Sequence, residues 1–159
     1  KYRDNLVNAY DNTIRYTDSF LSRLIHMLEE QHVDAAMLYT SDHGEDIFDD
    51  SRHLFLHASP VPSYYQLHVP FLIWMSDTYR EAYPEHWQTV TVNKDKDVSS
   101  SCSFFPTMLE LGGAQTSYRN ESSPVVSPRY TMMPRVFLND HNEPRPLDVR
   151  GKTQPNFQK

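Results

Sequence analysis

The stretch "VDAAMLYTSDHGED", residues 33–46, decides the fold class of this 159-residue chain. It opens with a short apolar run, Ala35–Thr40, which predicts a strand that is buried on both faces. Before it, apolar side chains recur at steps of three and four over Asn5–Gln31, which predicts a long amphipathic helix with Asp4 as its N-cap. A helix followed by a buried strand is the second half of a βαβ unit. The pattern therefore favours an α/β fold with a mainly parallel sheet.

Further elements follow along the chain. The apolar run Val69–Met75 predicts a second, central strand, and Asp77–Tyr83 predicts a short helix. Alternation in "WQTVTVN", residues 87–93, is typical of an edge strand. The segment "SSSCSFFPTMLELGG", residues 99–113, predicts a helix with Pro106 in its first turn and glycines at its end.

The composition changes after Ala114. Prolines become frequent and apolar residues rare, so we divide the chain into an α/β part, residues 1–114, and an irregular C-terminal extension, residues 115–159. Within the extension, Arg135–Leu138 predicts one edge strand, and the last twenty residues are typical of an extended tail.

Charge and composition exclude several classes of protein. Hydrophobic residues make up 38% and charged residues 23% of the chain, which is enough for a packed core. The formal net charge is −6 and basic residues are scattered, which argues against a nucleic-acid partner. No apolar run approaches the roughly 20 residues that span a bilayer, so the chain itself is expected to be soluble. Cys102 is the only cysteine, which excludes an internal disulfide and a cysteine-based zinc cluster.

Polar groups gather directly after the first predicted strand. Asp42 and His43 lie where ligands bind in parallel α/β sheets, and Gly44 allows a sharp turn there. A carboxylate and an imidazole together suit zinc or a similar divalent ion, but a third group must come from elsewhere. From the residues alone, an acidic capped turn remains an equal alternative. The loop and strand that follow offer three further histidines: His53, His57 and His68.

The neighbouring residues in the sequence distinguish these three histidines as candidate ligands. His57 is the best candidate because it follows the apolar anchor "LFL" and precedes a turn. His53 lies in a charged, solvated run and is expected to be a surface residue. His68 precedes a strand, where a supporting or structural role is as plausible as metal ligation.

Several motifs, taken in order, resemble one family. "NAYDNTIRYTDSFLSRLI" (residues 8–25), "YTSDHGED" (39–46) and "LFLHASPVPSYYQLHVPFLIWMS" (54–76) are similar to the phosphoethanolamine transferases. These are membrane-anchored, periplasmic members of the sulfatase and alkaline phosphatase superfamily. "FFPTMLELGG" (104–113) is similar to the superfamily's Pro-Thr helix. The resemblance implies an alkaline-phosphatase-like α/β/α sandwich, of which residues 1–114 would be the C-terminal half.

The resemblance also implies a role for each site residue. Asp42 and His43 match paired ligands of the catalytic zinc, and His57 matches a histidine that binds a second zinc or the transferred phosphoryl group. Glu45 and His68 are expected to support these ligands from a second shell. One or two zinc ions are therefore expected. No residue of this chain matches the family's nucleophilic threonine, which lies upstream of these motifs, so the isolated chain is expected to be inactive.

The activity that the resemblance implies is ping-pong transfer. The threonine would attack the phosphorus of phosphatidylethanolamine and release diacylglycerol, and a lipid A, core or glycan acceptor would then take the phosphoethanolamine. N-terminal membrane helices would hold the full-length protein at the periplasmic face of the inner membrane of a Gram-negative bacterium. Two alternatives stay open: a sulfatase, phosphatase or phosphodiesterase of the same superfamily, and a catalytically inert fragment or binding module.

Overall fold

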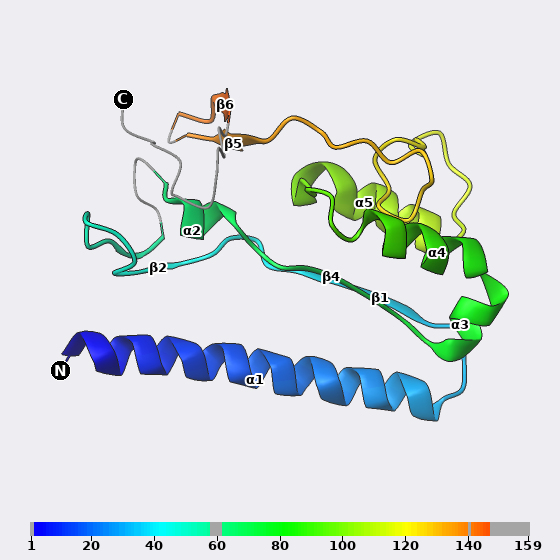
Figure 1. Cartoon of the computed structure of the whole chain (residues 1–159), viewed down its shortest axis with the longest axis horizontal. Coiled ribbons are helices and arrows are strands. Elements are labelled where there is room, and N and C mark those ends of the chain that lie inside the picture. The colour runs from blue at the N-terminus through cyan, green and yellow to red at the C-terminus, as the bar shows by residue number, and fades with distance from the viewer. Residues whose placement is uncertain (1, 58–61, 140, 147–159) are drawn as a thin grey trace. The chain divides into compact units, whose positions relative to one another are not determined.

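The computed structural model describes residues 2–57, 62–139 and 141–146 (Figure 1). Most of the predicted C-terminal tail lies outside these ranges. Contacts divide the chain into two compact units, unit 1 within residues 1–30, 41–69 and 136–159, and unit 2 within residues 31–40 and 70–135. In the described ranges, no helix is both long and apolar enough to cross a membrane. The helices are α1 (Tyr2–Glu30), α2 (Tyr64–Leu67), α3 (Asp77–Ala82), α4 (Pro84–Asn93) and α5 (Ser100–Leu111), and the strands are β1 (Ala36–Thr40), β2 (Asp46–Ile47), β3 (Phe55–Leu56), β4 (Phe71–Met75), β5 (Val136–Leu138) and β6 (Pro144–Pro146).

Unit 2 is built on the two strands predicted from the apolar runs. β1 and β4 pair antiparallel, with Ala36 opposite Met75 and Thr40 opposite Phe71. The prediction of a mainly parallel sheet is therefore wrong for the described residues, whose sheets are all two-stranded and antiparallel. The reason lies in the connection: its described part contains a hairpin and the single-turn helix α2, whereas a parallel pair needs a crossover, usually a longer helix.

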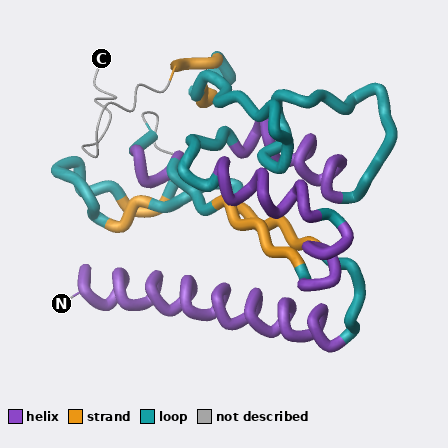
Figure 2. The backbone as a smooth tube through the Cα atoms, turned by 45° about the vertical axis from the view of Figure 1, so that its right-hand side comes forward, coloured by secondary structure: helices purple, strands orange, loops and turns teal. Residues whose placement is uncertain are grey.

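The core of unit 2 combines β4, α3 and the chain after α5. Met75, Tyr79 and Val126 form a buried cluster. The Tyr79 hydroxyl donates to the Leu111 carbonyl at 2.8 Å and accepts from Nδ1 of His86 at 2.9 Å. Burial raises the pKa of Tyr79 to about 12. Figure 2 shows α4 and α5 on one side of the β1–β4 pair.

The raised pKa of Tyr79 makes unit 2 sensitive to alkali. The folded state holds the Tyr79 hydroxyl proton more tightly than the unfolded chain does. The contribution of this proton to the unfolding free energy is therefore complete below pH 10 and is lost as the pH rises towards 12. We expect the difference in unfolding free energy between the wild type and Tyr79→Phe to shrink by roughly 2 kcal/mol over that range. Urea unfolding at several pH values measures it. A difference that stays constant with pH would contradict the prediction.

Three local predictions need correction. Residues 87–93 form the C-terminal part of α4 and not an edge strand, because Pro84 opens a helix there and the Asn93 side chain donates to the Val125 and Ser127 carbonyls. Pro106 lies in the interior of α5 and not in its first turn, since the helix begins at Ser100. Asp4 lies inside the first turn of α1 and is not its N-cap. Its negative charge there interacts favourably with the positive end of the helix dipole.

Unit 1 contains the long helix α1, the β2–β3 hairpin, α2 and the β5–β6 hairpin. The predicted helix over residues 5–31 is confirmed with its start three residues earlier, and the predicted strand at Arg135–Leu138 is confirmed as β5. Arg3 ties the start of α1 to the β2–β3 hairpin by donating to the Phe48 carbonyl at 2.7 Å. The Phe48 ring stacks on Phe55 across the hairpin at 5.2 Å.

Candidate metal centre

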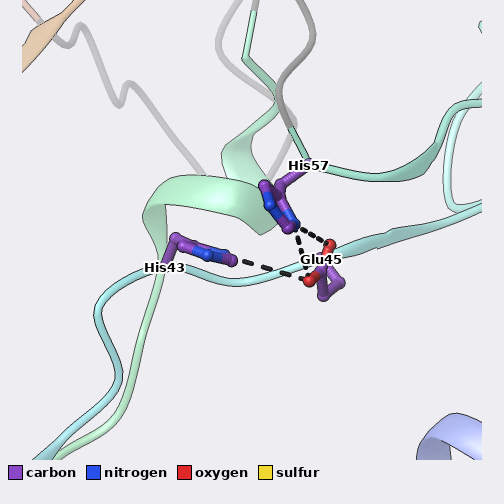
Figure 3. Close-up of side chains that lie close together, drawn as sticks. All are labelled: His43, Glu45 and His57. Atoms are coloured by element: carbon purple, nitrogen blue, oxygen red, sulfur yellow. Dashed lines mark hydrogen bonds and ion pairs between the residues drawn. The ribbon is translucent and has the colours of Figure 1, made fainter.

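The β2–β3 hairpin brings together two segments that carry the predicted ligands. Asp46 pairs with Leu56 in this hairpin, and the next position outward sets Glu45 opposite His57. His43 lies two residues before Glu45, on the segment that leaves β1. Figure 3 shows the side chains of His43, Glu45 and His57 pointing towards one another. One ligand atom from each of the three can be chosen so that all lie within 4.8 Å of one another.

Hydrogen bonds fix which ring nitrogen of each histidine is available. Nδ1 of His57 lies 2.8 and 3.0 Å from the two Glu45 carboxylate oxygens. Nδ1 of His43 lies 3.0 Å from the Gly44 carbonyl oxygen. Because these oxygens only accept, both Nδ1 atoms must carry the proton. In the neutral rings, each Nε2 then keeps its lone pair, which is the arrangement that metal-binding histidines use.

Asp42 lies beside Nε2 of His43. Its Oδ2 is 3.7 Å from Nε2 of His43, so one ion could contact both groups. Its Oδ1 accepts from the backbone N–H of His43 at 3.0 Å, and this bond lowers the pKa of Asp42. The Asp42 side chain is 88% exposed, so the carboxylate is open to an incoming ion.

The structure separates the remaining histidine candidates from this cluster. The His43 and His57 rings are 4.1 Å apart between centroids. His53 is exposed at the far end of the hairpin, and its backbone N–H donates to the Asp50 carbonyl. His68 ends α2 and stacks on Tyr64 at 4.7 Å, which is a structural contact. His43, Glu45 and His57 are thus brought together with Asp42 alongside, and His53 and His68 are not.

Sequence reasoning missed the residues behind this cluster. Asp46 and Gln66 are buried polar side chains that hydrogen-bond to each other, and the backbone N–H of Gly44 donates to the Gln66 carbonyl at 2.8 Å. The signal in the sequence was weak, because nothing distinguishes Asp46 from the other acidic residues of its run. Only the fold shows that it points inward.

Residues 1–114 match the sulfatase family. The chain belongs to the sulfatase family. Among curated relatives of this sulfatase-family chain, phosphoethanolamine transferase EptA of Salmonella typhimurium is 32% identical over 131 residues, which cover 79% of the chain and 23% of EptA. Kdo(2)-lipid A phosphoethanolamine 7''-transferase of the same organism is 38% identical over 85 residues, which cover 52% of the chain and 14% of that protein.

A solved structure supports the fold of the sulfatase-family chain. The C-terminal periplasmic domain of EptC from Escherichia coli, in complex with zinc, matches with a TM-score of 0.72 and 22% identity. The match covers 82% of the chain and 36% of that domain. The chain is thus a mixed α/β segment homologous to phosphoethanolamine transferases, with a fold similar to that of the EptC periplasmic domain, and it spans less than a quarter of the length of the curated relatives above.

Proposed function

We propose that this chain supplies part of the zinc site of a phosphoethanolamine transferase. The full-length enzyme would move phosphoethanolamine from phosphatidylethanolamine to a lipid A, core or glycan acceptor at the periplasmic face of the inner membrane. Family membership supports the enzyme class, and both relatives described above carry transferase names, which favours transfer over hydrolysis.

The observation that carries the proposal is the cluster of His43, Glu45 and His57, in which one ligand atom of each residue lies within 4.8 Å of the other two, with Asp42 beside His43. Both histidines have Nδ1 committed to an oxygen acceptor, and carboxylates lie beside both rings. Imidazole nitrogen and carboxylate oxygen are the donors that zinc prefers when cysteine is absent. The donor set therefore fits zinc, with Asp42 and His43 holding one ion and His57 binding a second ion or the phosphoryl group.

The chain's own residues would bind and orient, while the attacking group would come from elsewhere in the domain. Bound zinc would supply Lewis-acid stabilisation of negative charge. Glu45 would orient the His57 ring through its bond to Nδ1 and leave Nε2 as the ring nitrogen that carries a lone pair. Asp42 would keep its negative charge for the metal because the His43 backbone N–H donates to it.

The functional test uses two proteins: the isolated chain, and EptA in which the aligned segment is replaced by the residues of this chain. We expect the isolated chain to release no diacylglycerol from fluorescent phosphatidylethanolamine, because none of its residues matches the nucleophilic threonine. When the 131 aligned residues replace their counterparts in EptA of Salmonella typhimurium, we expect lipid A to gain phosphoethanolamine, measured by mass spectrometry.

The matched control is the same exchange carrying His43→Ala, expressed to the same level, in which the modification should be lost. Turnover by the isolated chain would contradict the incomplete-site part of the proposal. A stable exchange protein that leaves lipid A unmodified would contradict the transferase assignment.

A further inference from the structure

A buried contact lies next to the cluster of His43, Glu45 and His57, between the segment 43–46 and α2 (Tyr64–Leu67). The backbone N–H of Gly44 donates to the Gln66 carbonyl at 2.8 Å. The two backbones approach so closely that a Cβ on Gly44 would lie 2.0 Å from the Tyr65 carbonyl oxygen. The chain that carries His43 and Glu45 therefore rests directly on the backbone of α2.

A side-chain bond reinforces this backbone contact. The Gln66 side-chain amide donates to the carboxylate of Asp46. Asp46 is 1% exposed and Gln66 is 6% exposed, so the bond is made away from water. A buried carboxylate is costly unless its oxygens receive hydrogen bonds, so this pair strongly favours one arrangement of the two segments. We call it the Asp46–Gln66 clamp.

Gln66 is itself held in place. The Ser63 side chain is fully buried and caps α2 by accepting from the Gln66 backbone N–H at 3.1 Å. Backbone N–H, backbone carbonyl and side-chain amide of Gln66 are therefore all engaged. A residue fixed at three points is a firm support for the segment that it contacts.

The clamp is connected to every member of the cluster. Gly44 and Asp46, which contact Gln66, alternate along the chain with His43 and Glu45, which face the cluster. Asp46 also pairs with Leu56, the residue before His57. A shift of Asp46 would therefore move Glu45 and the strand that carries His57 together.

We propose that Asp46 and Gln66 are positioning residues that hold His43, Glu45 and His57 in a metal-binding geometry. This inference rests on the proposed zinc site and adds the support that orders it. Among the described residues, the hydrogen bonds of Gln66 go to Ser63, Gly44 and Asp46 and not to a candidate ligand atom, so the clamp acts through the backbone of segment 43–46 and through the β2–β3 hairpin. Preorganised ligands bind metal more tightly because less conformational entropy is lost on binding.

The test measures the zinc affinity of the whole chain by competition with a chromophoric zinc chelator. Gln66→Leu keeps a similar volume but removes the donor, and we expect it to weaken zinc binding roughly 10- to 100-fold, the range seen when supporting groups are lost. The reciprocal exchange Asp46→Asn with Gln66→Glu restores one amide donor and one carboxylate acceptor. We expect this double variant to bind zinc within about threefold of the wild type, while each of its single changes binds more weakly.

The controls separate this inference from the proposed function. Gln88→Leu makes the same chemical change at an exposed position on α4 and should leave zinc affinity unchanged. Circular dichroism shows whether each variant is folded; if Gln66→Leu unfolds, the reciprocal double variant decides. A wild type that binds zinc while folded Gln66→Leu binds it equally well would overturn the clamp alone, as would a folded double variant that does not recover. A wild type that binds no zinc would overturn the proposed site, and the clamp's role with it.

Discussion

Replacing Gly44 with alanine is expected to lower the zinc affinity of the chain by about 100-fold, the upper end for changes that misplace a metal ligand. The added methyl group would lie 2.0 Å from the Tyr65 carbonyl oxygen and 3.5 Å from Cα of Gln66. The obstacle is backbone and not the end of a flexible side chain, so the segment carrying His43 and Glu45 must move away from α2. That movement also lengthens the 2.8 Å bond from the Gly44 N–H to the Gln66 carbonyl.

A global loss of structure would not produce the same pattern. Overpacking of this kind costs about 1–3 kcal/mol, so unfolding followed by circular dichroism should show a modest change beside the large change in zinc affinity. Gly113→Ala is the matched control. Gly113 has a φ of +62° with nothing within 4 Å of the added methyl, so this variant carries backbone strain without a collision and should bind zinc normally. Equal zinc affinity in Gly44→Ala and the wild type would contradict the close approach.

The elements of the fold were predictable where a single periodicity held. The apolar steps in residues 5–31 gave α1, and the short apolar runs gave β1 and β4 to within two residues. The sense of the β1–β4 pair was predicted wrongly from these runs, because a short continuous apolar run is typical of parallel sheets but also occurs in other buried strands. The decision lies in the connection, whose mixed pattern concealed a hairpin.

The incorrect prediction of an edge strand at residues 87–93 has a different cause. Alternating threonine and valine favours a strand locally, but Pro84 supplies a helix start, and tertiary bonds from Asn93 to the chain after α5 fix the helix end. β-propensity depends strongly on context, and here the context is a segment more than thirty residues further along the chain. No local pattern could have contained that information.

The candidate site was likewise predictable only in part. Residue type and order indicated Asp42, His43 and His57, and the family resemblance added Glu45; the structure brings His43, Glu45 and His57 together. The sequence did not show which atoms of these residues bond to one another. The register of β2 with β3 sets Glu45 opposite His57, and this geometry alone shows that Glu45 bonds to the ring that it would orient.

This bond leads to a second large effect, an asymmetry between the two histidines. Nε2 of His43 lies beside Asp42, so His43→Ala removes a ligand from that pair and is expected to lower zinc affinity by at least about 100-fold. His57→Ala leaves the Asp42–His43 pair intact and should cost about tenfold. His141→Ala, at an exposed position in the turn between β5 and β6, is the control and should leave zinc affinity unchanged.

A double-mutant cycle then defines the role of Glu45. If Glu45 acts by orienting His57, Glu45→Gln lowers zinc affinity in the wild type, but it has no further effect once His57 is alanine, since the ring it orients is gone. If the Glu45 carboxylate instead contacts the ion directly, Glu45→Gln lowers the affinity by the same factor in both backgrounds. We expect the first result. The two outcomes differ by the whole effect of the single substitution, so competition titrations of the four proteins distinguish them.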